Sequence, residues 1–227
     1  GKAAPSYVRA KLIIKLLNSV AAVVNNDKRI GERLKVVFIP NYSVSLAERI
    51  IPAADLSEQI STAGTEASGT GNMKFALNGA LTIGTLDGAN IEIREEVGPE
   101  NIFIFGMTAE EAAYEKKCKS RKPLQVYENN PEVHAIIDAI AHGASSDGDR
   151  HLSRPIAADL LSEHAPHPLL LDLASYLECQ RLVGETYANR ATWLRRSILN
   201  VARVGKFSSD RTIREYAEEI WGLQVER

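Results

Sequence analysis

The sequence predicts an α/β fold in which a parallel sheet is flanked by helices and followed by a helical C-terminal layer. Short apolar runs rich in valine and isoleucine are typical of strands that are covered on both faces. These runs alternate with segments of helical periodicity, which predicts βαβ units. After Gly106 only helical patterns follow. We therefore divide residues 1–227 into an α/β part at residues 1–107 and a mainly helical part at residues 108–227.

The α/β part begins with a helix at residues 7–24, where apolar residues recur at the i, i+3, i+4 and i+7 spacing. We expect strands at residues 34–39, 56–61, 81–85 and 102–105. Helices are expected at residues 45–51, 72–77 and 89–97. The last of these segments also fits the arm of a hairpin, and we favour the helix because the alternation predicts parallel crossovers.

The second part contains helical patterns at residues 108–117, 131–142, 156–163, 175–187 and 192–204. Breaks fall at residues 143–149 and 166–168, where glycine or proline interrupts the pattern. A final helix follows Ser208, Ser209 and Asp210, which offer an N-cap. Its apolar stripe predicts docking on another surface and consists of Ile213, Tyr216, Ala217, Ile220 and Trp221.

Charge and hydropathy exclude several classes of partner. The 27 Lys and Arg residues against 29 Asp and Glu residues give a net charge of −2, without the basic excess that nucleic-acid binding needs. No apolar run is long enough for a membrane span, and no leader opens the chain, so we expect a cytoplasmic protein. The chain starts at Gly1 and enters a helical pattern at once, which we interpret as a piece of a longer protein.

Cysteine and histidine spacing favours neither a disulfide nor a metal centre. Cys118 and Cys179 are far apart and are expected to be free, buried thiols. His164 and His167 have a spacing that metal ligands can use, but the prolines beside them favour a loop. Asp147 to Asp149 lacks the remaining ligands of a calcium loop and is interpreted as a turn.

A glycine-rich stretch is the first candidate for chemistry. Residues 68–72, Ser-Gly-Thr-Gly-Asn, follow a predicted strand and open a predicted helix. Glycines let main-chain N–H groups approach a phosphate, and the positive end of a helix dipole favours the anion. A tight turn with nothing bound explains the stretch equally well, so both interpretations stay open here.

Two nucleotide-binding motifs fail at this stretch. Gly64 to Gly69 has the spacing of a Walker A loop, but Thr70 and Gly71 stand where its lysine and hydroxyl residue belong. Read as GxGxxG from Gly69, the motif places Lys74 at its third glycine, where a side chain would keep helix and strand apart. Neither a magnesium nucleotide nor a dinucleotide is therefore expected.

Lys74 lies about one helical turn beyond the glycines, between the apolar residues Met73 and Phe75. An amine in an apolar pocket favours its neutral form, which condenses with aldehydes. Pyridoxal phosphate carries both an aldehyde and a phosphate, so it fits a lysine beside a phosphate loop. The alternative is a solvated lysine on an exposed helix face, which the chemistry alone favours.

The stretches Glu66 to Phe75 and Asn78 to Asn90 resemble the cofactor segment of the α-1,4-glucan phosphorylases, the family that acts on glycogen, starch and maltodextrin. The similarity extends over nearly the whole chain and is weakest at residues 116–167. The resemblance implies the C-terminal, cofactor-carrying half of a GT-B glycosyltransferase, which has two Rossmann-like domains facing across a cleft. The last helix of that fold returns to the first domain, which would explain the apolar stripe.

The resemblance also implies cofactor contacts. Lys74 would hold pyridoxal phosphate as an imine, and Thr70 with the main chain of Gly71 would hold the cofactor phosphate. Tyr42 would line the cofactor ring. Some members have arginine after this tyrosine, whereas this chain has Ser43. In the family the cofactor phosphate exchanges a proton with the substrate phosphate as general acid and base.

Substrate contacts follow in the same way. Glu66, with Ser68 and Gly69 acting through their main chains, would grip hydroxyls of the transferred glucose. Lys74 and Glu66 are thus the implied catalytic residues. Tyr7 matches a ring beside the active-site entrance in some members, although it fits a core position equally well.

The implied reaction transfers a glucosyl unit from an α-1,4-glucan to inorganic phosphate and gives glucose 1-phosphate with retention of configuration. The implied partners are the glucan, phosphate, an N-terminal domain and, for the whole enzyme, a second copy. Groups that bind the substrate phosphate would lie upstream, so we expect the chain alone to be inactive. A noncatalytic pyridoxal phosphate- or sugar-binding domain is the alternative. The acidic and arginine partners of an aminotransferase are not recognisable.

Overall fold

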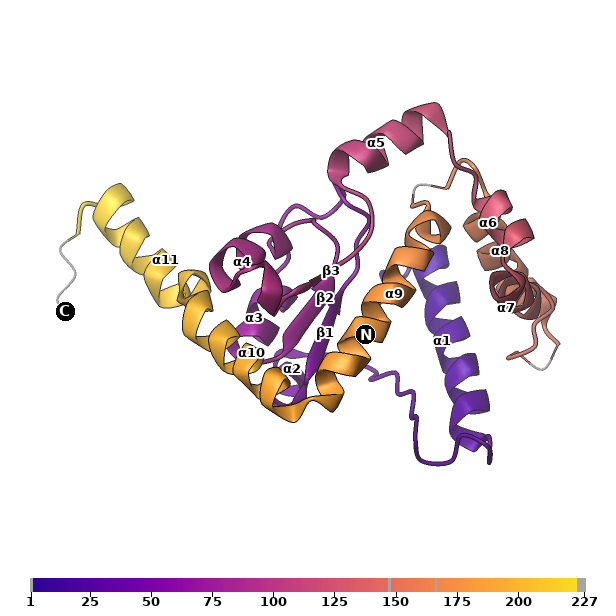
Figure 1. Ribbon diagram of the computed structural model, residues 1–227, viewed down its shortest axis with the longest axis horizontal. Helices are drawn as coiled ribbons and strands as arrows, with labels where there is room; N and C mark the ends of the chain where they lie inside the picture. Colours follow the sequence, from indigo (N-terminus) through magenta and orange to yellow (C-terminus); the bar gives the residue numbers. More distant parts are fainter. Residues whose placement is uncertain (1, 147, 166, 224–227) are drawn as a thin grey trace. The chain divides into compact units, whose positions relative to one another are not determined.

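A parallel sheet organises one of the two compact units in the computed structural model, which describes residues 2–146, 148–165 and 167–223 (Figure 1). Its described strands are β1 (Leu56–Gln59), β2 (Leu81–Gly84) and β3 (Phe103–Ile104), in the order β1-β2-β3. Both neighbouring pairs are parallel, with Leu56 opposite Leu81 and Ile83 opposite Phe103. The α/β class and the parallel pairing are therefore confirmed.

Each compact unit consists of two separate stretches of sequence. Unit 1 comprises residues 1–47 and 115–171, and unit 2 comprises residues 48–114 and 172–227. The described strands all precede residue 107, and the described chain after that residue forms helices, as its periodicity predicted. The division into compact units therefore differs from the division at residue 107, where the secondary structure changes from mixed to helical.

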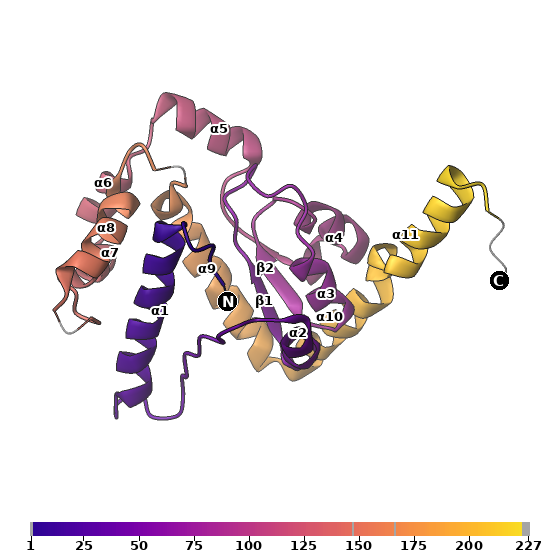
Figure 2. The same ribbon diagram turned by 180° about the vertical axis from the view of Figure 1, so that it is seen from behind.

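Helices cover both faces of the sheet in unit 2 (Figures 1 and 2). On one face Leu81, Ile83, Phe103 and Phe105 form a core with α9 (Leu169–Ala188) and α10 (Arg190–Arg203) through Cys179, Val183 and Trp193. On the other face Ile102 meets α3 (Gly71–Leu77), α4 (Asn90–Val97) and Val204, through Ala76, Ile93 and Val97. All four residues of β2 are buried, Thr82 included, as expected for a strand that is covered on both faces.

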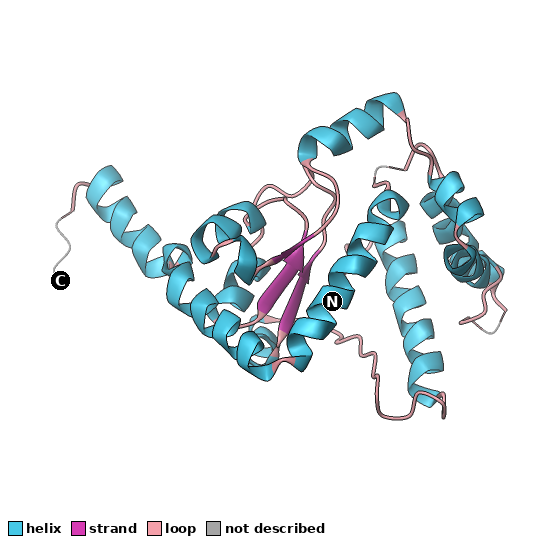
Figure 3. Cartoon of the chain, viewed as in Figure 1, coloured by secondary structure: helices cyan, strands magenta, loops and turns pink. Residues whose placement is uncertain are grey.

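The remaining elements are helical (Figure 3). They are α1 (Val8–Asn26), α2 (Val44–Ile50), η1 (Ile51–Ala53), η2 (Pro99–Asn101), α5 (Ala109–Cys118), α6 (Pro123–Asn129), α7 (Pro131–Ala141), α8 (Arg150–Leu161), η3 (Val204–Phe207), α11 (Ser209–Glu215) and η4 (Tyr216–Ile220). Helix α4 settles the ambiguity between helix and hairpin at residues 89–97 in favour of the helix. No described helix combines the length and the apolar character needed to cross a bilayer.

The predicted strand at residues 34–39 is wrong, because this segment is irregular. The side chain of Asn25 takes the place of a strand partner: its Nδ2 donates to Val36 O at 2.8 Å, and its Oδ1 accepts from Val36 N at 2.9 Å. Val37 is 74% exposed, and Val36, Phe38 and Ile39 are only half-buried, so the apolar run is not enclosed as a core strand would be. A run of β-branched residues becomes a strand only where another strand pairs with it.

Unit 1 corrects two further boundaries. Helix α8 begins at Arg150 rather than residue 156 and carries Pro155 in its interior, because Asp149 caps it by accepting from His151 N. Helix α6 was not predicted, although Pro123 at its first turn is a typical start signal. Helix α7 begins as expected, with Asn130 as its N-cap. Asp147 and Pro166, which belong to the predicted breaks, lie outside the described residues.

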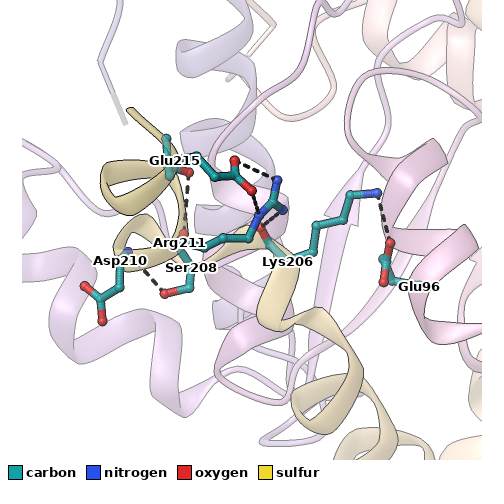
Figure 4. Close-up of polar contacts among 7 residues, drawn as sticks. Glu96, Lys206, Ser208, Asp210, Arg211 and Glu215 are labelled. Carbon is teal, nitrogen blue, oxygen red and sulfur yellow. Dashed lines mark hydrogen bonds and ion pairs between the residues drawn. The ribbon is translucent and has the colours of Figure 1, made fainter. Parts of the chain in front are cut away.

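The predicted cap of the last helix is confirmed. Ser208 Oγ accepts from Asp210 N at 3.3 Å, and Arg211 is hydrogen-bonded to both Glu215 and Lys206 O (Figure 4). Of the apolar stripe only Ala217 is buried, while Ile213, Tyr216, Ile220 and Trp221 are exposed. The docking predicted for this stripe stays a prediction.

Candidate functional site

The candidate residues converge at the carboxyl ends of two neighbouring strands. Residues 60–70, which we call the glycine loop, follow β1 and lead into α3. Residues 85–89, the β2–α4 turn, follow the adjacent parallel strand. Because parallel strands end at the same edge of a sheet, the two segments meet there, as ligand-binding loops of open α/β sheets do.

Asp87 in the β2–α4 turn ties the two segments together. Its carboxylate accepts hydrogen bonds from Ser61 Oγ at 2.7 Å, Gly64 N at 2.8 Å and Glu66 N at 2.9 Å. The residue is 4% exposed. No role was predicted for Asp87, although an acidic residue shortly after a buried strand could have indicated a hydrogen-bond acceptor for the neighbouring loop.

Glycines in this region serve different purposes. Gly69 has a φ of +81° and Gly88 a φ of +51°, in the left-handed region that favours glycine. A Cβ on Gly88 would lie 2.6 Å from Ser68 O, so the two segments could not approach as they do. A Cβ on Gly71 would meet only Gln59 Nε2, at 3.9 Å, within 4 Å. Packing therefore does not require glycine at position 71.

The first turn of α3 offers open hydrogen-bond donors. Thr70 is the N-cap, and its side chain makes no capping hydrogen bond. Within the described chain, the main-chain N–H groups of Gly71 and Asn72 have no acceptor. Such groups at a helix N-terminus are satisfied by water or by an anion. Thr70 and Gly71 are thus arranged as a phosphate site requires.

Lys74 lies one turn further along α3 and is exposed. Its main-chain N–H donates to Thr70 O at 3.2 Å, which continues the helix from the N-cap. No described residue forms a hydrogen bond or an ion pair with its ammonium group. The expected apolar pocket is not formed by the described residues, since Met73 and Phe75 are only half-buried. The amine is nevertheless accessible to a ligand at the first turn.

Glu66, Ser68 and Gly69 present polar groups on the outer side of the glycine loop. Glu66 and Ser68 are exposed. Ser68 N lies 3.5 Å from Glu66 Oε1, a long contact, and Ser68 Oγ donates to Gly69 O at 3.2 Å. Gly69 N has no acceptor in the part of the chain that the structure describes. One carboxylate and two main-chain donors are therefore available to a polyhydroxylated ligand.

The two tyrosines named from the sequence belong to the other unit. Tyr42 and Tyr7 lie in unit 1, where they are 42% and 57% exposed. The glycine loop and Lys74 lie in unit 2. The role of Tyr42 beside the cofactor ring therefore stays a prediction.

The weaker metal and thiol candidates remain without a site. Nδ1 of His164 lies 2.8 Å from Lys119 Nζ, a contact that leaves this nitrogen no role as a metal ligand. Among the described residues no group of three histidine, cysteine or acidic side chains could hold a metal. Both cysteines are free, as predicted, and Cys179 is buried, but the predicted burial of Cys118 is wrong because this residue is exposed.

A cavity of about 400 Å³ lies in unit 1, and Lys119 and His164 are among its lining residues. It is lined by both signs of charge, and Arg121 pairs with Glu115 Oε1 at 2.9 Å. Ser120 Oγ and the main chain and side chain of Arg121 donate to Glu115, which lowers the pKa of that carboxyl to about 2. The other acidic residue of the lining, Glu163, pairs with Lys122 Nζ at 3.0 Å, so both carboxylates of this cavity already have basic partners.

Comparison with known proteins identifies the family. The model of the family Phosphorylase, described as carbohydrate phosphorylase, matches residues 1–223. This chain belongs to the carbohydrate phosphorylase family. It is 59% identical over 224 residues to a glycogen phosphorylase of Synechocystis sp. and 55% identical over 223 residues to that of Chlamydia trachomatis. It is 54% identical over 225 residues to the human liver form of glycogen phosphorylase.

These matches cover 98% to 99% of this chain but only 26% or 27% of each relative. The chain thus spans about a quarter of the length of the curated relatives it matches. In this carbohydrate phosphorylase chain, the glycine loop and Lys74 lie together in unit 2, at the carboxyl ends of the sheet strands.

Proposed function

We propose that this chain is the pyridoxal phosphate-carrying part of an α-1,4-glucan phosphorylase. The reaction moves a glucosyl unit from the nonreducing end of the glucan to inorganic phosphate and gives glucose 1-phosphate with retention of configuration. The observation that carries this proposal is the open first turn of α3 with Lys74 one turn beyond it, in a chain of this family.

The residues of α3 fit the cofactor in three respects. Thr70 and the N–H groups of Gly71 and Asn72 have hydrogen-bonding capacity for a phosphate. Gly71 leaves the main chain open to the approach of a ligand, and there is room for a Cβ at this position, so packing alone does not explain the glycine. Lys74 provides an exposed amine for the covalent link. When bound, the cofactor supplies through its phosphate a group that exchanges a proton with the substrate phosphate.

The glycine loop would bind the transferred glucose. The Glu66 carboxylate can accept from two sugar hydroxyls, and hydrogen bonds to a charged acceptor are about twice as strong as neutral ones. Ser68 N and Gly69 N can donate to a further hydroxyl. Tyr42 would line the cofactor ring. Holding the sugar in one orientation converts its encounter with phosphate into an effectively unimolecular step.

This chain would work as part of a larger assembly. We infer a GT-B architecture in which an N-terminal domain supplies the groups that bind the substrate phosphate. The proposed partners are that domain, the glucan, inorganic phosphate and, in the whole enzyme, a second copy, all in the cytoplasm. Because the chain spans about a quarter of its relatives, it would be inactive alone, and by itself it would act as a noncatalytic cofactor- or sugar-binding domain.

Covalent trapping tests the cofactor site. The purified chain is incubated with pyridoxal phosphate, reduced with borohydride and mapped by peptide mass spectrometry. We expect the stable adduct on Lys74 and none in the Lys74→Ala variant. Lys11→Ala, which changes another lysine on a helix, is the matched control and should be labelled like the parent. An adduct spread over Lys2, Lys11 and Lys206, or no adduct at all, would contradict the proposal.

A further inference from the structure

The carboxylate of Asp87 is buried, and a buried carboxylate needs donors to replace the water it has lost. Its described donors are neutral: one hydroxyl, Ser61 Oγ, and two main-chain N–H groups, of Gly64 and Glu66. No basic side chain of the described chain pairs with it. Among the described residues, the carboxylate is therefore hydrogen-bonded to the glycine loop alone.

The three hydrogen bonds are divided between the two oxygens in a way that fixes the turn. Oδ2 accepts from both Ser61 Oγ and Glu66 N, and Oδ1 accepts from Gly64 N. Thr65 N donates to Thr62 O at 3.1 Å and Gly64 has a φ of +84°, so the chain forms a turn between Ser61 and Glu66. Asp87 bridges the start and the end of this turn and thereby sets the main chain from which the Glu66 side chain projects.

A second tie from the same turn holds the other side of Glu66. Ala89 N donates to Ser68 O at 2.8 Å, while Thr85 Oγ1 donates to Ser61 O at 2.6 Å. Glu66 and Ala67 thus lie between two hydrogen bonds, at Glu66 N and at Ser68 O, that both join the loop to the β2–α4 turn. Neither tie touches Lys74. Helix α3 is joined to the second tie through Asn72, whose Nδ2 donates to Ser68 O at 3.3 Å and to Asn90 Oδ1 at 3.1 Å, whereas Asp87 itself makes no hydrogen bond to α3.

We propose that Asp87 is the positioning residue that directs the Glu66 carboxylate toward the sugar, independently of cofactor binding at α3. The proposal rests on the sugar-binding role proposed above for Glu66. Asp87 acts through the glycine loop and does not touch the substrate. Its negative charge matters because three donors converge on it, and hydrogen bonds to charged acceptors are the stronger ones.

Asp87→Asn is the sharpest variant because it keeps the shape and removes the charge. Whichever way the amide is oriented, its NH₂ group must face at least one of the donors that the carboxylate accepts. Two donors then point at each other, and a buried N–H is left without an acceptor. The loop should open at residues 64 and 66, while α3 should keep its hydrogen bonds.

Amide hydrogen exchange followed by NMR tests this in the full chain, with and without pyridoxal phosphate. In the parent, the amides of Gly64 and Glu66 should be protected, whereas those of Ala67 and Gly69, which have no described acceptor, should exchange fast. In Asp87→Asn the exchange of Gly64 and Glu66 should accelerate at least about tenfold. Affinity for pyridoxal phosphate should change by less than about twofold, since Asp87 makes no hydrogen bond to α3.

Glu115→Gln is the matched control, because Glu115 is another buried carboxylate with three donors, located in unit 1. It should leave the exchange of Gly64 and Glu66 unchanged. Glucose added to the cofactor-loaded chain should shift the amide signals of Ser68 and Gly69, and Asp87→Asn should need at least about tenfold more glucose for this shift.

Three results would overturn the role of Asp87. They are fast exchange of Gly64 and Glu66 in the parent, unchanged exchange in Asp87→Asn, and a loss of cofactor affinity as large as the loss of protection. The parent measurement decides even if the variant does not fold. If glucose does not shift the amide signals of Ser68 and Gly69 in the parent, the proposed sugar-binding role of the loop is overturned instead. The exchange rates of Gly64 and Glu66 would still decide the role of Asp87.

Discussion

Residues 61–68 and residues 70–74 are parts of one continuous segment, yet their main-chain groups have different partners. In the first part, Gly64 N, Glu66 N and Ser68 O are hydrogen-bonded to the β2–α4 turn. In the second part, Gly71 N and Asn72 N have no described acceptor. The chain thus shapes the proposed sugar-binding half itself and leaves the proposed cofactor half to be completed by a ligand.

The largest expected effect concerns the two halves together. The chain alone should bind pyridoxal phosphate but should not phosphorolyse maltodextrin, because the groups proposed to bind the substrate phosphate are not among those described here. Each missing preorganised donor costs on the order of 100- to 1000-fold in rate, so the loss of several abolishes measurable turnover. A coupled assay for glucose 1-phosphate on the cofactor-loaded chain measures this. Turnover at a rate normal for the family would contradict the proposed division of the site.

Gly71→Val probes the open half. The valine side chain should obstruct the approach of a phosphate to the first turn of α3 and weaken pyridoxal phosphate binding by about 10- to 100-fold, or about 1.4–2.8 kcal/mol. The fold should tolerate it, because a Cβ there meets only Gln59 Nε2 at 3.9 Å. Cofactor titrations and melts of the apo form separate the two effects. A large drop in Tm at unchanged cofactor affinity would mean that the glycine serves the turn and not the ligand.

Gly88→Ala probes the held half and should give the opposite result. The new Cβ would lie 2.6 Å from Ser68 O at a φ of +51°, so the loop must shift or the main chain must strain. Such strain costs about 1–3 kcal/mol, and each kcal/mol lowers Tm by roughly 2–4 °C in a chain of this size. Cofactor affinity should stay within about twofold. A variant that melts like the parent would show that the two segments are not packed this closely.

The smallest expected effect is the loss of stability when Glu115 in unit 1 is protonated by acid. It provides a reference for a buried carboxylate outside unit 2. The pKa of this carboxyl is lowered from 4.5 to about 2, first by the hydrogen bond from Ser120 Oγ and then by those from Arg121. Its contribution to stability is therefore complete above pH 4.5 and is lost as the pH falls toward 2. Melts between pH 5 and pH 2.5 should show a shallower decline for Glu115→Gln than for the parent. Parallel declines would exclude this carboxyl as a source of acid sensitivity.

Local pattern was sufficient for the elements that pack against the sheet. Strands β1 and β2 and helices α3 and α4 lie where periodicity and glycine positions predicted them. The segment 34–39 failed because strand identity depends on a neighbour, and Asn25 supplies the pairing instead. The early start of α8 was missed because the Asp149 cap outweighs Pro155 in setting the boundary.

The same distinction applies to the candidate site. Glu66, Ser68, Gly69, Thr70, Gly71 and Lys74 are neighbours in sequence, so one motif and its resemblance sufficed to name them. Asp87 is 21 residues from Glu66, and its hydrogen bonds to the loop depend on the register of β1 against β2. A single sequence does not specify that register. Tyr42 depends on the placement of a different unit, which no local pattern contains.

The two units are interleaved along the chain, and this constrains how the protein can be divided. Residues 48–114 separate the two stretches of unit 1, and residues 115–171 separate the two stretches of unit 2. Neither unit is therefore complete until segments far apart in sequence have met. Closing such long loops costs conformational entropy before the contacts between these segments can stabilise the unit. Truncation before residue 172 would remove Cys179, Val183 and Trp193 from the core beneath the sheet while retaining the residues of every described strand. No single cut releases either unit intact, so the edge proposed to bind the cofactor cannot be excised as a smaller domain.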